Sequence, residues 1–275
     1  MTQSAIKSML ISIRHTTQYH YDGPVQHAVQ ALRLTPPSGL SQQVRHWSIH
    51  IPGFEGASQF TDAFGNVVHL VTPPGPVTSM EIVAEGQIET IDTAGVAGFT
   101  REAALPSLYL RQTSLTAPDE AIRDLAEQCQ SPDRLTRLHD LMGRIRDAVR
   151  YDTDATHALT TAGEALREGA GVCQDHAHVM IACARHLGIP ARYVTGYLHL
   201  EEDDTAVAHH AWAEAYTDDL GWIGFDPANR ICPSIHYVRL AVGLDARGAA
   251  PLRGIRLGPW VENLSVEVVV KQSQQ

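Results

Sequence analysis

The hydrophobic period changes about a third of the way along the chain, and this change limits the possible folds more than any other feature of the sequence. Over residues 9–91, short runs with alternating apolar and polar residues are separated by Gly and Pro, as in antiparallel strands. From residue 118 onward, apolar residues recur at helical spacing. A stretch rich in small residues, 92–100, lies between the two patterns. We therefore predict an α+β chain, with a β-rich sandwich domain at residues 1–98 and a second domain of helices packed on an antiparallel sheet at residues 99–275.

Three helices are expected in the second domain. Pro118 followed by two acidic residues is a helix start, and Ser131-Pro132-Asp133 opens a second helix whose apolar spacing continues to Arg150. A third helix is expected over 173–187, because Gly188 and Pro190 would end it. The strands expected after it are 191–200, 210–217, 221–227, 237–243 and 264–271.

The charge balance disfavours nucleic acid as a partner. The 275 residues contain 21 Lys and Arg against 31 Asp and Glu, a net charge of -10, which would repel a phosphate backbone. The apolar run near the N-terminus is shorter than the core of a signal peptide, and no later stretch has the length of a membrane span. We therefore expect a cytoplasmic protein with no membrane partner, and no functional role for residues 1–8.

The four cysteines form no CxxC pair, which argues against a disulfide framework and against a thiolate zinc site. Cys173 differs from the others because it stands at the first turn of an expected helix, where unpaired amides and the helix dipole favour a thiolate. Its backbone N–H is also available to an oxyanion. We interpret Cys129, Cys183 and Cys232 as small buried apolar residues.

A nucleophilic thiol needs a base, and the base needs a group that fixes its tautomer. If the hairpin turn centres on residues 218–219, His210 lies opposite residues 226–228, so that Asp226 becomes its neighbour. A register slip of one residue would present His209 instead, which stays a weaker candidate.

Three motifs in this order, GVCQDHAH (171–178), HAW (210–212) and GFDPAN (224–229), resemble those of bacterial transglutaminase-like proteins. The segments IRHTTQYHYDGPV, ALRLTPP and DAFGN are similar to the β-rich N-terminal domain of that group, and YVRLAVGLDARGAAPLRG is similar to its closing segment.

The resemblance implies a papain-like core in which Cys173 is the nucleophile, His210 the general base and acid, and Asp226 the orienting residue. It implies thiol-dependent acyl transfer or hydrolysis of a protein, peptide or small amide substrate through a thioester, in the manner of a cysteine protease or transglutaminase. No cofactor and no metal are expected.

Two positions depart from the family pattern: His176 replaces an aromatic residue, and Ala228 replaces a threonine. Neither is a member of the triad. A second oxyanion donor is still required beside the amide of Cys173. Tyr151 is the best candidate, although a packed tyrosine at a helix end is the commoner situation. Gln174 and Trp212 are further candidates for substrate binding.

Alternatives to this reading remain open. His176 and His178 could suggest a metal, but residues two apart on a helix point to different faces. The acidic run 201–204 lacks the pattern of an EF-hand and is interpreted as a solvated loop beside the cleft. A non-catalytic protein that uses the same fold to bind a peptide or partner is a further hypothesis.

The β-rich domain would shape the substrate cleft, mediate formation of a homodimer or support the core; the sequence leaves these three roles open. We expect Tyr19, Tyr21 and Trp47 to be packing residues, and Asp62 and Asn66 to form a turn around Phe64-Gly65.

Overall fold

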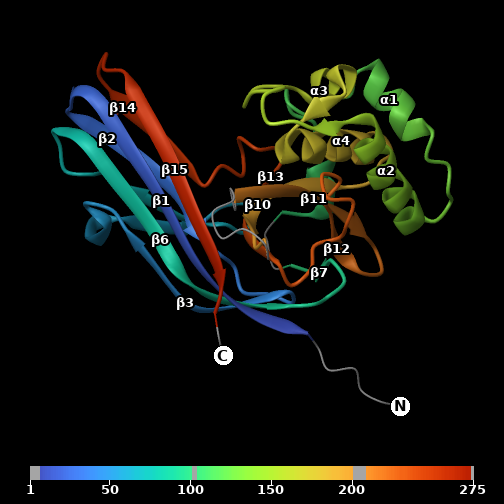
Figure 1. Cartoon of the computed structure of the whole chain (residues 1–275), viewed down its shortest axis with the longest axis horizontal. Helices are drawn as coiled ribbons and strands as arrows, with labels where there is room; N and C mark the ends of the chain where they lie inside the picture. Colours follow the sequence, from blue (N-terminus) through green and yellow to red (C-terminus); the bar gives the residue numbers. More distant parts are fainter. Residues whose placement is uncertain (1–6, 101–103, 201–208, 274–275) are drawn as a thin grey trace.

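The computed structural model describes residues 7–100, 104–200 and 209–273, and Figure 1 shows its two parts, a β-sandwich and a smaller sheet covered by helices. The predicted α+β class is therefore confirmed, with the β-rich region at the N-terminal end of the chain. The expectations for residues 1–6 and for the acidic run 201–204 fall outside the described residues.

The sandwich consists of two four-stranded antiparallel sheets. One has the order β15-β1-β6-β3 and the other β14-β2-β5-β4. Their strands are β1 (Ser8–Val25), β2 (His27–Thr35), β3 (Gln42–His50), β4 (Ser58–Thr61), β5 (Val67–Val71), β6 (Val77–Ile91), β14 (Leu252–Leu257) and β15 (Glu262–Gln272). Burial alternates along β1 residue by residue, which places one face of the strand in the core. Tyr19 and Tyr21 lie on that buried face, as expected for packing residues.

The C-terminal strands occupy a different place from the one we expected. They were assigned to the second domain, but β14 pairs with β2 and β15 pairs with β1, so both complete the sandwich. The short strand β7 (Val96–Gly98) also crosses the expected boundary, because it pairs with β12 of the second sheet. Strand pairing between distant segments decides both placements, and the local sequence pattern carries no information about it.

The second part is a five-stranded antiparallel sheet in the order β13-β10-β11-β12-β7. Its other strands are β10 (Ala191–Leu198), β11 (His209–Thr217), β12 (Gly221–Phe225) and β13 (Tyr237–Gly243). The helices are α1 (Glu120–Glu127), α2 (Arg134–Ala148), α3 (Ala162–Glu168) and α4 (Cys173–His186), with single 3-10 turns at Phe54–Gly56 and Pro106–Leu110. A parallel two-residue pair joins β8 (Arg150–Tyr151) to β9 (Ala170–Gly171). None of the described helices is long and apolar enough to cross a membrane.

Helix α4 is the centre of this second part. Every residue from Asp175 to Arg185 is buried, and the helix packs against α1, α2 and α3 as well as β10 and β11. A helix that is covered on all sides is expected to be apolar around its whole circumference. The apolar run Val179–Ala182 meets that expectation and belongs to the apolar core, whereas the buried polar residues Asp175, His176, His178 and Arg185 are hydrogen-bonded instead.

The starts of α1 and α2 follow the sequence signals. Asp119 accepts a hydrogen bond from the Ile122 amide at 3.0 Å, and Asp133 accepts one from Thr136 at 2.7 Å. Helix α3 was not predicted from the sequence. Its signal was a capping box, in which Thr161 and Glu164 each bond the other's backbone amide.

A pair of histidines lies where the sandwich meets the second sheet. His15 of β1 is 3 % exposed, and its Nδ1 lies 2.9 Å from the hydroxyl of Tyr197 in β10. The ring of His209 in β11 lies 6.2 Å from that of His15. Burial, reinforced by the neighbouring histidine, lowers the pKa of His15 to about 3 and, with His210 as the neighbour, that of His209 to about 4.

These two pKa values predict that the fold loses stability in mild acid. Below the ordinary histidine pKa of 6.5 the unfolded chain binds protons that the folded chain does not bind until about pH 3 to 4, so the free energy of unfolding falls as the pH falls through that window. Each group contributes a slope of up to about 1.4 kcal/mol per pH unit. The measurement is urea unfolding between pH 7 and pH 4.

The variant His15→Gln should flatten this pH dependence, whereas His20→Gln, at an exposed position on the same strand, should leave it unchanged. Equal slopes for His15→Gln and the parent chain would contradict the assignment.

Candidate active site

Cys173 is the first residue of helix α4 and is half-buried. The carbonyl of Val172 accepts the amides of Asp175 and His176 at 3.0 and 3.1 Å. The amides of Cys173 and Gln174 precede the first intrahelical bond, so neither has an acceptor within the helix. The thiol therefore sits beside two N–H groups at the positive end of the helix dipole, where an anion is favoured.

A buried carboxylate holds the chain in front of Cys173. One oxygen of Asp175, Oδ2, accepts the amide of Val172 at 2.8 Å and the hydroxyl of Thr156 at 2.6 Å. Burial raises the pKa of Asp175, although these two donors oppose the shift. The carboxylate fills the space beside Gly171, where a Cβ atom would lie 2.7 Å from Oδ2. Gly171 is thus required for the turn that presents the cysteine.

His210 near the start of β11 lies between Cys173 and Asp226. Its Nε2 is 2.7 Å from Asp226 Oδ2, which leaves Nδ1 for the thiol of Cys173, its other hydrogen-bond partner. Burial by itself lowers the pKa of His210, but the hydrogen bonds and negative charges of Asp226 and Cys173 outweigh it and raise the pKa to about 10. The ring is thus held as an imidazolium beside the sulfur.

The ladder between β11 and β12 explains how His210 and Asp226 meet. It runs from Thr217 opposite Gly221 to Ala213 opposite Phe225. Asp226 directly follows the last paired residue of β12, and its backbone forms an isolated bridge with Ile231. The hairpin thus brings the two side chains together, in the register that the turn at residues 218–219 indicates.

Asp226 is fully buried, and three donors converge on its Oδ2. Besides His210, the hydroxyl of Tyr237 donates to it at 2.7 Å and the side-chain amide of Asn229 at 2.8 Å. Burial raises the pKa of this carboxyl, but the hydrogen bonds and the charge of His210 prevail and hold it below the usual value. Neither Tyr237 nor the role of Asn229 is predicted from the sequence. Asn229 had a local signal, since it follows Asp226 by one turn; Tyr237 had none.

Two aromatic side chains pack against the His210 ring. Trp212 stacks at a centroid distance of 6.4 Å with an interplanar angle of 26°, and Tyr237 lies edge-on at 5.8 Å. Trp212 is only 2 % exposed and packs against both His210 and Tyr237. Trp222 is equally buried and lies under the guanidinium of Arg192 at 3.8 Å.

Tyr151 lies near Cys173 and Asp226, whereas the side chains of Gln174, His209 and His176 bond to other groups. Tyr151 is 45 % exposed; burial, then the charges of Cys173 and Asp226, raise the pKa of its hydroxyl. The side chain of Gln174 donates to the carbonyl of Ala158 at 3.4 Å. His209 faces the sandwich, with Nε2 2.9 Å from the hydroxyl of Thr195. His176 lies under Tyr151, and its two ring nitrogens are 2.8 and 2.9 Å from the carbonyls of Val172 and Val149.

The remaining cysteines differ from Cys173 in their electrostatic surroundings. Cys129 and Cys183 are buried and Cys232 is half-buried. Burial raises the pKa of all three thiols, that of Cys129 to about 11. Neutral thiols are poor nucleophiles, so these positions are expected to be unreactive near neutral pH.

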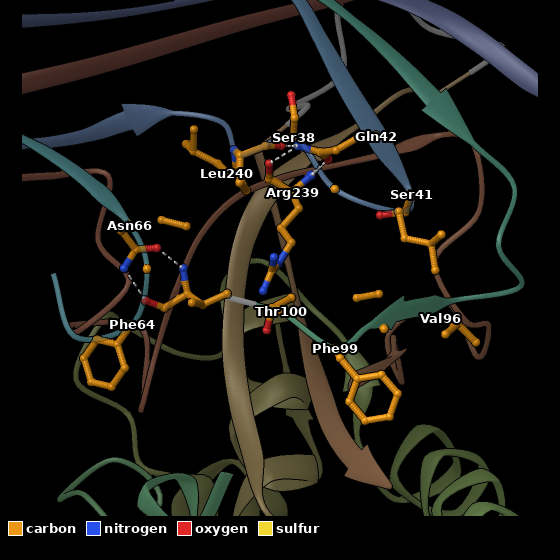
Figure 2. A pocket seen from close by; sticks show the side chains of 18 of the residues that line it. Ser38, Ser41, Gln42, Phe64, Asn66, Val96, Phe99, Thr100, Arg239 and Leu240 are labelled. Atoms are coloured by element: carbon orange, nitrogen blue, oxygen red, sulfur yellow. Dashed lines mark hydrogen bonds between the residues drawn. The ribbon is translucent and has the colours of Figure 1, made fainter. Parts of the chain in front are cut away.

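A separate cavity of about 720 Å³ lies between the sandwich and the second sheet. Figure 2 shows Phe64 and Asn66 on one side of it, Phe99 on the other, and Arg239 pointing into it. None of Cys173, His210 and Asp226 lines this cavity. The arrangement suited to chemistry is therefore at the end of α4, and the cavity belongs to the domain interface.

Comparison with known proteins assigns both parts of the chain. Residues 123–227 match the model of the transglutaminase-like superfamily, and residues 11–89 match that of the bacterial transglutaminase-like N-terminal region. A solved structure from Cytophaga hutchinsonii, described as a candidate cysteine protease, is 21 % identical and covers 98 % of this chain and 92 % of its own, with a TM-score of 0.76. This likeness shows the fold of the whole chain.

Two relatives by sequence are informative. An uncharacterized protein of Mycobacterium leprae is 27 % identical over 93 % of this chain and 96 % of its own length. A protein-glutamine gamma-glutamyltransferase of Pseudomonas aeruginosa is 30 % identical over 112 residues, which are 34 % of this chain and 16 % of that enzyme.

The contact between Gly171 and Asp175 predicts that Gly171→Ala is damaging. The new methyl group would push the carboxylate off Val172 and Thr156, at a cost of about 1 to 3 kcal/mol in the free energy of unfolding, and would displace Cys173. Alkylation of Cys173 by iodoacetamide should slow in the same variant. Urea unfolding and timed mass spectrometry measure the two effects.

Gly143→Ala is the matched control, since nothing lies within 4 Å of its Cβ position inside helix α2. It should stabilise the protein by roughly 1 kcal/mol and leave alkylation unchanged. A Gly171→Ala variant as stable and as reactive as the parent would refute the proposed role of Gly171.

Proposed function

Because the chain belongs to the transglutaminase-like superfamily, we propose that it is a thiol-dependent enzyme acting on amide bonds of protein, peptide or small amide substrates. The observation that carries the proposal is the hydrogen-bonded line from Cys173 through His210 to the buried Asp226. This line contains a nucleophile, a proton carrier and an orienting anion in the order that acyl transfer requires.

The first half of the reaction uses the ion pair. The thiolate of Cys173 attacks the carbonyl carbon, a C–S bond forms, and the carbonyl oxygen becomes an oxyanion. The imidazolium of His210 then donates its proton to the leaving nitrogen, the C–N bond breaks, and an amine departs from a thioester. The raised pKa of His210 supports this role, because the proton must be present on the ring before the amine leaves.

The second half reverses the proton path. Neutral His210 takes a proton from water or from an incoming amine, which attacks the thioester, and the C–S bond breaks to restore the thiolate and the imidazolium. Asp226 keeps Nε2 protonated throughout, so that Nδ1 is the nitrogen that exchanges the proton. Water as acceptor makes the protein a hydrolase; an amine makes it a transglutaminase.

The oxyanion needs two donors. The backbone N–H of Cys173 is one, since no carbonyl within the helix accepts from it. The hydroxyl of Tyr151 is our proposal for the second, supported by its partial exposure and by the electrostatic effect of Cys173 and Asp226 on its pKa.

The central prediction concerns Cys173. Incubation with glutamine-containing peptides should give deamidated or cleaved products when no amine is added, and amine adducts when a primary amine is added. Cys173→Ala should lower turnover by roughly four to six orders of magnitude. Mass spectrometry of the peptides measures both outcomes, and Cys232→Ala is the control that should retain activity.

Iodoacetamide labelling at neutral pH separates the enzyme from a binding protein with the same fold. Rapid labelling confined to Cys173 supports the enzyme. Labelling no faster than that of Cys232, together with no turnover by the parent chain, would favour the non-catalytic alternative. Turnover that persists in Cys173→Ala would remove the proposed mechanism.

Tyr151→Phe distinguishes an oxyanion donor from a packing residue. Loss of one donor should lower kcat about 10²-fold with little change in KM, because the interaction forms only when the oxyanion forms. Alkylation by iodoacetamide produces no oxyanion, so its rate should stay the same. A variant in which both rates fall together would show that Tyr151 only shapes the site.

A further inference from the structure

Strand β13 is an edge strand, and its free edge is bound by side chains of the N-terminal sandwich. The side-chain carbonyl of Gln42 accepts the amide of Arg239 at 2.8 Å, and its NH2 group donates to the Arg239 carbonyl at 2.9 Å. One primary amide thus satisfies both backbone groups of the residue, as a neighbouring strand would. Gln42 is 3 % exposed, and a buried backbone group without a partner would destabilise the fold.

A second amide repeats this contact three residues further along β13. Asn66 accepts the amide of Val242 at 2.8 Å and donates to the Val242 carbonyl at 2.8 Å. Figure 2 shows Asn66 and Gln42 with their hydrogen bonds on either side of Leu240. In addition, the hydroxyl of Thr90 in β6 donates to the carbonyl of Ile235, just before β13. Asn66 therefore has a role beyond the turn that we expected it to form.

The strand held in this way carries Tyr237, whose hydroxyl donates to Asp226 at 2.7 Å. Tyr237 is 5 % exposed and packs edge-on against Trp212 at 5.4 Å. We call the side-chain amides of Gln42 and Asn66 that bind β13 the amide clamp. Gln42 and Tyr237 line the same small cavity of about 20 Å³, so the clamp and the tyrosine are close neighbours. A chain of direct contacts therefore links the sandwich to the carboxylate of the site.

We infer that the N-terminal sandwich positions the catalytic carboxylate: Gln42 and Asn66 fix strand β13, and Tyr237 on that strand fixes Asp226 against His210. This inference rests on the function proposed above. It makes Tyr237 a positioning residue, and it gives the sandwich a direct part in the chemistry.

The test is the pH dependence of Cys173 alkylation by iodoacetamide, which requires no substrate. Tyr237→Phe keeps the ring and removes the donor that lowers the pKa of Asp226. The pH at which the alkylation rate falls to half on the acid side of the profile should therefore rise by roughly one unit. Tyr216→Phe, at a half-buried tyrosine of β11, is the matched control and should not move it.

Gln42→Met and Gln42→Glu test the clamp. Gln43→Met on the same strand is the control, since among the described residues the side chain of Gln43 bonds to Gly39 and not to β13. Gln42→Glu retains an acceptor for Arg239 and should give the smaller shift, which keeps the test informative if Gln42→Met is too unstable to measure. Because the clamp acts through Tyr237, neither Gln42 variant should add a further shift to Tyr237→Phe.

Two results would overturn the inference: a Tyr237→Phe profile that superimposes on that of the parent, or shifts from Gln42 and Tyr237 that simply add. Asp226→Ala separates this failure from failure of the proposed function. If Asp226→Ala displaces the profile and Tyr237→Phe does not, only the inference fails. If Cys173 is unreactive in the parent chain, the proposed function fails with it.

Discussion

The carboxylate of Asp226 is buried completely, and the geometry of the site depends on keeping it charged there. Removing an ion from water costs several kcal/mol unless hydrogen bonds replace the lost solvation. Three donors on one oxygen, from His210, Tyr237 and Asn229, supply that replacement. The same oxygen therefore fixes the tautomer of the histidine, and the histidine in turn faces the thiol.

The site is assembled from elements that come from different parts of the fold. Cys173 is placed by a helix that is covered on all sides, and His210 and Asp226 by one hairpin of the sheet. Tyr237 comes from the edge strand β13, which depends on the sandwich for the partners of its outer backbone groups. The apolar residues Val238, Leu240 and Ala241 of β13 also belong to the sandwich core. Both domains of the chain consequently contribute to one site.

The sequence predicted the parts of the site that depend on local chemistry. A helix start after Gly171 placed Cys173, and a short turn at residues 218–219 placed His210 near Asp226, because neighbours across a hairpin follow from the turn. Tyr237 and Gln42 could not be found in this way. Gln42 lies 197 positions from Arg239, and only the packing of two domains brings them together.

The same distinction explains the differences in the fold. Helix α3 had a readable capping box but too few apolar positions to stand out by periodicity. The alternating pattern of LSVEVVVK predicts a strand, and β15 confirms it. The pattern does not indicate which strand it pairs with, and β15 pairs with β1 near the N-terminus. Propensity and periodicity predict whether a segment is a helix or a strand. Which strands it pairs with depends on the tertiary packing of the whole chain.

The pairing of β15 with β1 has a consequence for biosynthesis. The register joins Ile11 to Gln272 and Tyr21 to Glu262, and the helical domain is inserted between strands β1–β6 and strands β14–β15 of the sandwich. During translation the first strands leave the ribosome early but must wait for residues 252–272 to complete their sheets. The inserted domain has its own apolar core and is synthesised completely before then, so it is the unit able to fold first. Strand β13 would then gain its contacts with the sandwich only after residues 252–272 have completed the two sheets.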